Sequence, residues 1–400
     1  MILNYFTDND LYKFTTMNAI QKLYPNAVVK YSFINRGKTS LPENFGEELK
    51  KELDSMANIS LNREEEKFIR SKCYYFDPVF IDLLKGYRYD PSEVVIEQNG
   101  SDLKVEIEGL WYRTVLWEVP ILSLISELYY RMMNIKPVEV EDRAAAKARN
   151  MNELEAEFSD FGTRRRFSFD VHNNVIGTLK KHSPVFFKGT SNVCLAMLND
   201  LVPLGTHPHE WFMFHASQYG YRGANARGLD AWVEVYRGYL GTALSDTYTS
   251  DVFFSSFSVL HAKLFDGIRQ DSGDPLEFID KAVCFYLKNR IDPSTKTIVF
   301  SDALDFDKIR KIRQHSAGKI HDVYGIGTYL SNDAGAKPLN IVIKMAEAKI
   351  NHGDQFHHVV KLSDDHAKYT GNPEEIELCL RTLGINKKPS AGGGSEFNQG

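Results

Sequence analysis

Leu264-Phe-Asp-Gly-Ile268 runs directly into Arg269-Gln-Asp-Ser-Gly273 and then into Asp274-Pro275-Leu-Glu277, and this succession decides the fold. The first run is short and mostly apolar, which predicts a buried strand. The polar cluster that follows predicts a loop. Asp274 can then cap a helix that has proline at its first position and glutamate at its third. Strand, polar loop and helix in this order are typical of parallel α/β folds.

The same succession recurs about six times after residue 160. Each apolar run ends in a cluster of Gly, Ser, Thr or Asp, and functional residues of α/β barrels lie at such strand ends. An open doubly wound sheet would give a similar pattern. We favour an irregular α/β barrel of parallel strands, because polar clusters follow nearly every strand rather than one switch point. The other predicted strands are residues 185–188, 201–204, 239–244, 297–300 and 320–324, with one further buried strand at 339–344.

The N-terminal third predicts a smaller α+β domain. A helix is expected from a cap at Asp8 or Asp10 to about Tyr24, followed by a strand at 27–34. Asn99-Gly100 separates two alternating runs and is a strong hairpin signal. The expected domains are an N-terminal α+β domain (1–135), the barrel (136–345), a C-terminal segment that packs back on the first domain (346–388) and a flexible Gly/Ser-rich tail (389–400).

The composition is that of an ordinary globular protein of 400 residues, with 43% hydrophobic and 25% charged residues. A net charge of −5 gives no reason to expect nucleic acid or a membrane surface as a partner. Neither a signal peptide nor an apolar run of roughly 20 residues stands out. The four cysteines are far apart, which favours free thiols in a reducing compartment. We therefore expect a cytoplasmic protein.

Two of the predicted loops carry groups suited to phosphates. Gly325-Ile-Gly327-Thr328 follows a strand, and its glycines would let backbone N–H groups approach a phosphate. An ordinary tight turn is the alternative, since the third glycine of a dinucleotide fingerprint is missing. Arg269 can clamp a phosphate or carboxylate with two parallel bonds, and Asp271 can accept from ribose hydroxyls or hold Mg²⁺. A salt-bridged loop is the alternative there.

The segment Asp160-Phe161-Gly-Thr-Arg164-Arg165-Arg166 places an aromatic ring beside three arginines. An aromatic ring next to a guanidinium group suits a flat anionic heterocycle. The aromatic ring can stack on the heterocycle while the guanidinium binds its carboxylate. A row of arginines is usually a solvated face. We therefore expect one of the three to contact substrate.

The pair His207 and His209 allows three interpretations. A His-x-His metal site, as in amidohydrolase barrels, would need further ligands on later strands. A structural histidine is the second possibility. The third is an activated nucleophilic or acid–base imidazole, which Glu210 would help to orient.

Taken together, these residues resemble nicotinate phosphoribosyltransferases of the type II phosphoribosyltransferase family. The likeness extends from Asp10-Leu-Tyr12-Lys13 to Lys361-Leu-Ser-Asp364. Between these ends the matching motifs are Trp117-Glu-Val-Pro120, the arginine segment after Asp160, Gly189-Thr-Ser-Asn192, Gly205-Thr-x-x-His209-Glu-Trp211, Arg269-Gln-Asp-Ser-Gly-Asp-Pro275, Phe300-Ser-Asp302, Tyr324-Gly-Ile-Gly-Thr328 and Leu339-Asn-Ile-Val-Ile-Lys344.

The resemblance implies an irregular α/β barrel with an N-terminal domain, and a homodimer whose active sites are completed across the interface. It implies that nicotinate reacts with phosphoribosyl pyrophosphate to give nicotinate mononucleotide and pyrophosphate. ATP is the co-substrate, its hydrolysis is coupled through a phosphohistidine, and Mg²⁺ accompanies the phosphates. The histidine that matches the phosphorylated one is His209.

Carried over to this sequence, the resemblance also assigns substrate contacts. Phe161 would stack on the pyridine ring, with Tyr12 of the partner subunit on its other face. Arg164 and Arg269 would contact the base and its phosphates, and Asp271 would bind the ribose hydroxyls. The 5′-phosphate would lie on Gly325, Gly327 and Thr328, and the remaining expected contacts are Thr190, Ser191, Ser301 and Asp302.

Ser191 bears on whether the substrate is an acid or an amide. The resemblance places an aspartate at this position in the nicotinamide-using relative. A second carboxylate about 4 Å from that of nicotinate would cost roughly 4 kcal/mol at an effective dielectric of 20. A serine there favours nicotinate. Two other classes stay open: a metal-dependent hydrolase that uses His207 and His209, and a silent paralogue that binds ligands without turnover.

Overall fold

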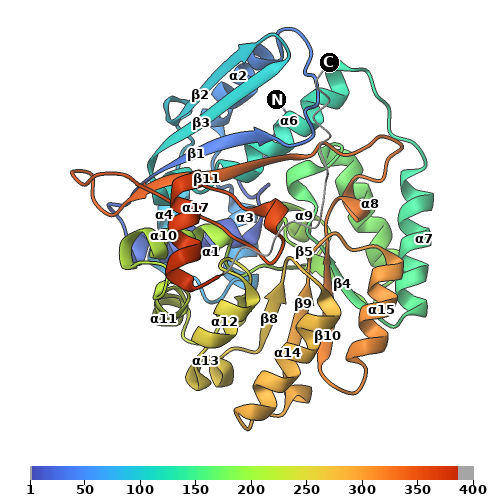
Figure 1. Cartoon of the computed structure of the whole chain (residues 1–400). Coiled ribbons are helices and arrows are strands. Elements are labelled where there is room, and N and C mark those ends of the chain that lie inside the picture. The colour runs from blue at the N-terminus through green and yellow to red at the C-terminus, as the bar shows by residue number, and fades with distance from the viewer. Residues whose placement is uncertain (1, 386–400) are drawn as a thin grey trace, which may run out of the picture.

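The computed structural model describes residues 2–385 and contains two sheets (Figure 1). One has seven parallel strands in the order β6-β5-β4-β10-β9-β8-β7, and it curls into a half-barrel with helices around its outside. The other has five antiparallel strands in the order β12-β11-β1-β3-β2 and lies at one end of the curled sheet. The predicted barrel with a separate α+β layer is confirmed. The tail predicted at 389–400 falls outside the described residues.

The antiparallel sheet confirms the predicted hairpin. Asn99 pairs with Asp102, so the loop between its two strands has only two residues. The strand predicted at 339–344 is present, but it pairs with β1 and thus belongs to this sheet rather than to the barrel. Its side chains are buried mainly at every second position, which is typical of a strand with one face on the core. The strands are β1 (Val28–Asn35), β2 (Val94–Asn99), β3 (Asp102–Leu110), β11 (Ile341–Lys349) and β12 (His357–His358).

All pairings within the barrel sheet are parallel, so the carboxyl ends of its strands share one edge. Two strands, β5 and β8, begin and end two or three residues later than predicted, and polar residues form their last ladder positions. Gln270, for example, ends a strand while buried, and its amide donates to the carbonyl of Ser272 at 2.7 Å. The strands are β4 (Glu157–Asp160), β5 (Phe187–Thr190), β6 (Val202–Pro203), β7 (Thr242–Leu244), β8 (Gly267–Gln270), β9 (Thr297–Phe300) and β10 (His321–Ile326).

His207 connects the two edges of the curled sheet. The edge strands β6 and β7 are consecutive in the chain, and no backbone ladder joins them among the described residues. Instead, the backbone N–H of Leu244 in β7 donates to Nε2 of His207, four residues beyond β6, at 3.0 Å. The imidazole is 1% exposed. The structural interpretation therefore holds for His207.

Helices cover the outside of the barrel and pack between the two sheets (Figure 1). The predicted cap at Asp274 is confirmed, because its carboxylate accepts from the N–H of Leu276 at 2.8 Å. The N-terminal helices are α1 (Leu11–Leu23), α2 (Phe45–Ser55), α3 (Arg63–Lys72), α4 (Pro78–Gly86), α5 (Trp111–Thr114), α6 (Glu118–Met132) and α7 (Val140–Glu153). The remaining helices are α8 (Phe169–His182), α9 (Val193–Leu198), α10 (His209–Tyr219), α11 (Ala224–Tyr236), α12 (Ser250–Ser256), α13 (Val259–Leu264), α14 (Pro275–Lys288), α15 (Phe306–Ser316), α16 (Thr328–Ser331) and α17 (Pro373–Leu383).

The start of α1 differs from the expected cap. Asp10 stands at the N-cap position but makes no side-chain cap bond, and its Oδ1 accepts from the hydroxyl of Ser191 at 2.8 Å instead. Asp8 forms a buried two-pronged ion pair with Arg166, at 2.7 and 2.8 Å. The N–H of Leu11 donates to the carbonyl of Ser191 at 2.7 Å. These bonds fix the start of α1 against the carboxyl end of β5.

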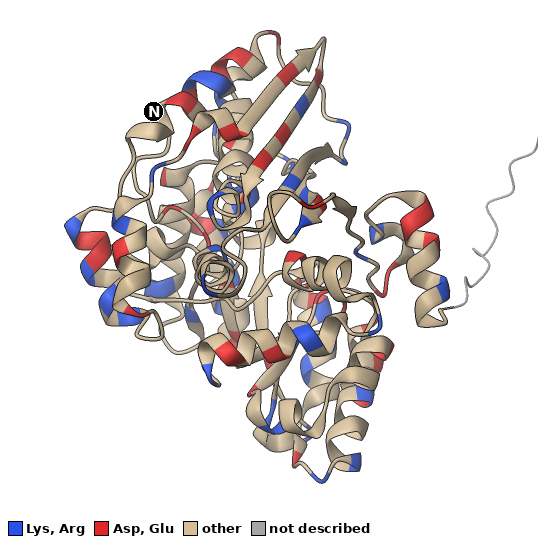
Figure 2. Cartoon of the chain, turned by 90° about the vertical axis from the view of Figure 1, so that its left-hand side faces the viewer, with Lys and Arg blue, Asp and Glu red and all other residues tan. Residues whose placement is uncertain are grey.

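The surface shows no concentration of positive charge in the view of Figure 2, where acidic and basic residues are interspersed over the helices and the β2–β3 hairpin. This distribution agrees with the net charge of −5. Within residues 2–385, every helix is too short or too polar to cross a bilayer.

Candidate active site

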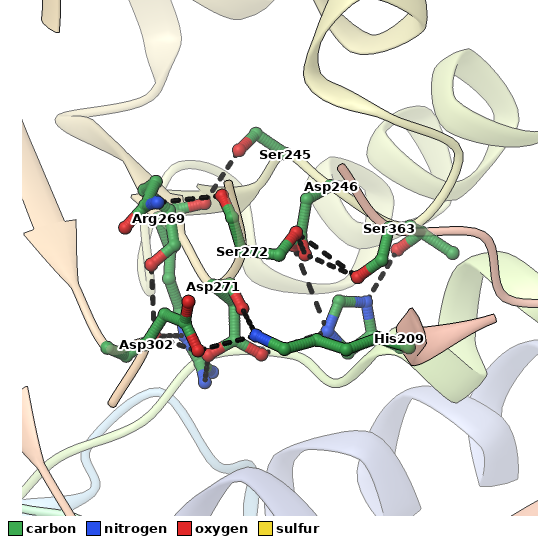
Figure 3. Close-up of polar contacts among 12 residues, drawn as sticks. His209, Ser245, Asp246, Arg269, Asp271, Ser272, Asp302 and Ser363 are labelled. Atoms are coloured by element: carbon green, nitrogen blue, oxygen red, sulfur yellow. Dashed lines mark hydrogen bonds and ion pairs between the residues drawn. The ribbon is translucent and has the colours of Figure 1, made fainter. Parts of the chain in front are cut away.

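Polar side chains from several strand ends meet at the mouth of the half-barrel (Figure 3). The parallel register places the ends of β7, β8 and β9 next to one another. Arg269 belongs to β8, Asp271 directly follows it, and Ser301 directly follows β9. Asp246 lies two residues beyond β7. His209 is brought to the same place by the first turn of α10.

Arg269, Asp271 and Ser301 form one bonded cluster. The guanidinium donates from Nε to the hydroxyl of Ser301 at 2.8 Å and from Nη2 to Oδ1 of Asp271 at 3.0 Å. The hydroxyl of Ser301 in turn donates to the same carboxylate oxygen at 2.6 Å. About a fifth of the Arg269 side chain is exposed. The cluster therefore holds a fixed cation at the mouth that still reaches solvent.

His209 has a partner at each ring nitrogen. Nε2 lies 3.1 Å from Oδ2 of Asp271 and 3.8 Å from Oδ1 of Asp246, and Nδ1 lies 3.0 Å from the hydroxyl of Thr247. Ionised carboxylates only accept hydrogen bonds, so we assign the ring proton to Nε2. This tautomer leaves a lone pair on Nδ1.

The protonation states follow from burial and from the neighbouring charges. Burial, with Lys361 nearby, lowers the pKa of His209 to about 4, although Asp246 and Asp271 oppose the shift. Burial alone would raise the pKa of Asp271, but Arg269 and His209 hold it well below its usual range. At neutral pH the site thus contains a neutral imidazole beside an ionised carboxylate.

Asp246 is fully buried, and among the described residues only one of its two carboxylate oxygens has hydrogen-bond partners. Its Oδ2 accepts from the hydroxyls of Ser272 at 2.5 Å and Ser363 at 3.3 Å. Its Oδ1 has no hydrogen-bond partner among the described residues and faces Nε2 of His209. Asp246 follows the predicted strand at 239–244 by two residues. The structure brings it to the imidazole.

The aromatic side of the mouth is formed by Phe161. Its ring lies against the backbone of Gly325, where a Cβ would come within 2.3 Å of the ring. The guanidinium of Arg269 lies 5.8 Å from the ring centroid. Gly325 is inside β10, so its missing side chain makes room for the ring. Gly327 and Thr328 lie beyond the strand, where β10 meets α16.

Arg164 lies beside Glu118 and Tyr12 of its own chain. Nη1 of Arg164 donates to Oε1 of Glu118 at 3.3 Å. Tyr12 is the main cause that raises the pKa of Arg164, which places its ring near the guanidinium. Of the other arginines in the segment, Arg166 is fully buried against Asp8 and is structural.

The hydroxyls of Thr190 and Ser191 each donate a hydrogen bond to a carboxylate. Thr190 donates to Oδ2 of Asp160 at 2.7 Å, and Ser191 donates to Asp10. The electrostatic argument made for Ser191 is therefore incomplete, because a buried carboxyl group lies next to it after all. Burial raises the pKa of Asp10, against the lowering effect of Arg164. The expected preference for an acid therefore depends on Asp10 and Arg164 as well as on Ser191.

Asp302 lies at the edge of the cluster and is bonded to the C-terminal segment. Its Oδ1 accepts from Nζ of Lys368 at 2.5 Å, and its backbone carbonyl accepts from Lys308 at 2.5 Å. About a fifth of the Asp302 side chain is exposed. It therefore fixes the position of Lys368 at the rim.

Three lysines were missed by sequence analysis. Lys13 is fully buried between Glu118 and Glu210, with ion pairs of 2.5 and 2.6 Å. Lys344 is buried as well, and burial with nearby Lys361 lowers its pKa to about 7. Lys344 and Lys361 stood within the motifs of the resemblance. Their spacing along the chain gave no sign that β11 and the segment after β12 would bring them to the barrel mouth.

The residues that could hold a divalent cation are His209, Asp246 and Asp271, whose nearest ligand atoms lie within 4.8 Å of one another. Mg²⁺ prefers oxygen ligands such as carboxylates and phosphates, which suits the two aspartates. His207 is not part of this group, because its Nε2 is bonded to β7. The His-x-His metal interpretation is therefore wrong.

His215, in the interior of α10, makes the folded protein sensitive to acid. Its Nδ1 donates to the carbonyl of Trp211 at 2.6 Å, and its Nε2 accepts from the hydroxyl of Tyr24 at 2.9 Å. Burial lowers its pKa to about 4. Between pH 6.5 and pH 4 the unfolded chain binds the extra proton, so stability is lost as the pH falls.

We expect this histidine to remove about 2 kcal/mol of unfolding free energy between pH 7 and pH 5. His215→Gln cannot titrate, so its unfolding free energy should fall correspondingly less over this range. Urea titrations of both proteins at the two pH values test this. Equal losses in the two proteins would contradict the assignment.

Comparison with known proteins relates this geometry to a family. Residues 156–384 match the model of the nicotinate phosphoribosyltransferase (NAPRTase) family, and residues 7–126 match that of the NAPRTase N-terminal domain. The chain is 48% identical over 390 residues to the nicotinate phosphoribosyltransferase of Chromohalobacter salexigens, with 97% of this chain and 100% of the relative covered.

Solved structures agree with this result. The crystal structure of nicotinate phosphoribosyltransferase from Porphyromonas gingivalis matches with a TM-score of 0.94 at 46% identity, covering 96% of this chain and 100% of that one. The enzyme of the same name from Vibrio cholerae matches with a TM-score of 0.89 at 30% identity, covering 97% and 95%.

Proposed function

The chain belongs to the nicotinate phosphoribosyltransferase family, and we propose that it joins nicotinate to phosphoribosyl pyrophosphate, giving nicotinate mononucleotide and pyrophosphate. The reaction is coupled to ATP hydrolysis through a phosphohistidine at His209 and serves NAD salvage. The observation that carries this proposal is the bonded cluster of Arg269, Asp271 and Ser301, which faces the Phe161 ring on one side and His209 on the other.

In the sugar transfer, the pyridine nitrogen attacks C1 of the ribose while the bond from C1 to pyrophosphate breaks. Positive charge develops on the ribose and negative charge on the departing pyrophosphate. The fixed guanidinium of Arg269 stabilises that negative charge, and Asp271 orients the ribose hydroxyls. Phe161 stacks on the pyridine ring, and Arg164 takes its carboxylate. The attacking group is the substrate itself, so the protein supplies no nucleophile.

In the ATP step, Nδ1 of His209 attacks the γ-phosphorus while the bond to the β-phosphate oxygen breaks and ADP leaves with the electron pair. The imidazole is neutral, so Nδ1 keeps a lone pair at neutral pH, and the phosphorus replaces the hydroxyl of Thr247 that donates to it. The proton on Nε2 stays hydrogen-bonded to Asp271, and the two aspartates offset the positive charge of the phosphorylated ring. The N-terminus of α10 also favours a phosphoryl group at its first residue.

Mg²⁺ fits the donor set of this site. The carboxylates of Asp246 and Asp271 would hold it together with phosphate oxygens, and Oδ1 of Asp246 is a buried acceptor without a hydrogen-bond partner among the described residues. When bound, the ion would offset the charge of the phosphates.

A turnover assay with nicotinate, nicotinamide and quinolinate, each with and without ATP, tests the proposal. We expect nicotinate to be preferred over nicotinamide by about 100-fold in kcat/KM, since Arg164 can form a charge-assisted pair only with the acid. ATP should increase the yield of mononucleotide at equilibrium. Equal use of nicotinamide, or no turnover of any of the three, would refute the assignment.

A further inference from the structure

A short segment of the C-terminal part crosses the barrel mouth. We call residues Lys361–Asp364 the strap. The N–H of Leu362 donates to the carbonyl of Thr247 at 2.8 Å, and the hydroxyl of Ser363 lies 3.3 Å from Oδ2 of Asp246. The strap therefore bonds to two consecutive residues of the loop that follows β7.

These two loop residues are the ones that face both nitrogens of the His209 ring. The hydroxyl of Thr247 lies 3.0 Å from Nδ1. Oδ1 of Asp246 lies on the side of Nε2 (Figure 3). Asp246 is fully buried, so the direction of its free oxygen depends on what holds its other oxygen. That other oxygen accepts from the hydroxyl of Ser272 at 2.5 Å, and the hydroxyl of Ser363 shares its single proton between this oxygen at 3.3 Å and Oγ of Ser272 at 3.1 Å.

The strap is held tightly where it meets the loop after β8. The N–H of Asp364 donates to the hydroxyl of Ser272 at 3.0 Å, and Ser363 lies 3.1 Å from the same hydroxyl. Gly273 has a φ of +79°, and a Cβ there would come within 2.8 Å of the Cβ of Asp364. A side chain at this glycine would push the strap off the loop.

Ser363 is held in a costly backbone conformation. It is fully buried with a φ of +96°, where residues other than glycine are rarely found. Such strain persists only where the surrounding structure over-determines it, and it concentrates at functional sites. Glycine would adopt this conformation more easily but has no hydroxyl to offer Asp246.

We propose that Ser363 is a positioning residue for the ATP-coupled step: its hydroxyl, presented by the strap, fixes the carboxylate of Asp246 so that the free oxygen faces Nε2 of His209. This inference rests on the proposed phosphohistidine. As the bond between Nδ1 and phosphorus forms, the ring gains positive charge, and a fixed carboxylate offsets it without having to reorient. Among the described residues the hydroxyl of Ser363 bonds to Asp246 and Ser272 and not to Arg269 or Arg164, so we expect the sugar transfer to depend on it far less than the ATP step.

Ser363→Ala removes the hydroxyl and keeps the strained backbone, while Ser363→Gly removes the hydroxyl and relieves the strain. Ser316→Ala is the matched control, because this fully buried serine also donates to an aspartate, Asp322, but lies in α15 away from the mouth. For each protein we would measure the rate of acid-labile labelling from γ-labelled ATP, and the rate of nicotinate turnover without ATP.

We expect both Ser363 variants to lose about 20-fold in the rate of His209 labelling, with less than a twofold change in ATP-independent turnover. Ser316→Ala should change neither rate. Unchanged labelling in the Ser363 variants, or an equal loss in both reactions, would overturn the positioning role. Full labelling in Ser363→Gly with loss in Ser363→Ala would also overturn it, because backbone strain would then matter rather than the hydroxyl. An unlabelled wild-type protein would instead refute the phosphohistidine on which the inference rests.

Discussion

Arg269→Ala is expected to lower kcat/KM for nicotinate turnover by about 10³-fold while the protein stays folded. The guanidinium is fixed by Ser301 and Asp271 and lies against the Phe161 ring, so it is already in place when negative charge appears on the leaving pyrophosphate. Its side chain is partly exposed, so its removal leaves no deep cavity. Steady-state kinetics at saturating phosphoribosyl pyrophosphate, with a thermal melt of each protein, measure both effects.

Two further variants make this result interpretable. Arg269→Lys keeps the charge but loses the planar fork, so its activity should lie between those of wild type and Arg269→Ala. Arg310→Ala removes an exposed arginine that pairs only with Asp307, three residues before it on α15, and should leave turnover unchanged. If Arg269→Ala keeps more than half of the wild-type activity, Arg269 is not the residue that stabilises the leaving pyrophosphate.

His209→Ala is expected to abolish labelling by γ-labelled ATP and to lower nicotinate-dependent ATP hydrolysis by about 10³-fold or more. Nδ1 of this imidazole carries the lone pair, and among the described residues His209 is the histidine that groups with two carboxylates, those of Asp246 and Asp271, within 4.8 Å. Sugar transfer without ATP should persist, because the substrate nitrogen is the nucleophile. Label mapping by mass spectrometry and paired assays with and without ATP test both statements.

His315→Ala serves as the control for this variant, since His315 is partly exposed and pairs with Asp280 on the outside of the barrel. It should retain full labelling. Undiminished label in His209→Ala would move the phosphoryl acceptor to another residue. Loss of turnover with and without ATP would show that His209 also serves the sugar transfer.

Much of the fold could be predicted because its signals are local. The run from Leu264 to Glu277 contains a strand, a loop and a helix start within 14 consecutive residues, and β8, its loop and α14 follow that order. Asn99-Gly100 likewise determines a two-residue hairpin by its own turn preference. The strand at 339–344 was found for the same reason. Its membership in the antiparallel sheet was not, because pairing depends on β1, some 300 residues earlier.

The same division holds at the site. Residues that directly follow strands, such as Asp271 and Ser301, could be found because parallel strands bring their ends together. Ser363 and Lys361 could not, since they reach the mouth from a segment that is not part of the barrel. The roles of His207 and Asp10 were also hidden, because a side chain's partner across the fold leaves no periodic signal.

The sequence by itself determined the strand–loop–helix rhythm and the family motifs, and it predicted a reactive imidazole in the segment around His209. Only the tertiary structure decided which atoms meet. His207 bonds to β7 and joins the two edges of the barrel sheet instead of lying in the site. Ser191 has a carboxyl partner in Asp10, and the strap lies next to Asp246. The physical reason is range: propensities and turn chemistry act over a few residues, whereas burial and hydrogen bonding pair groups that are far apart in the chain.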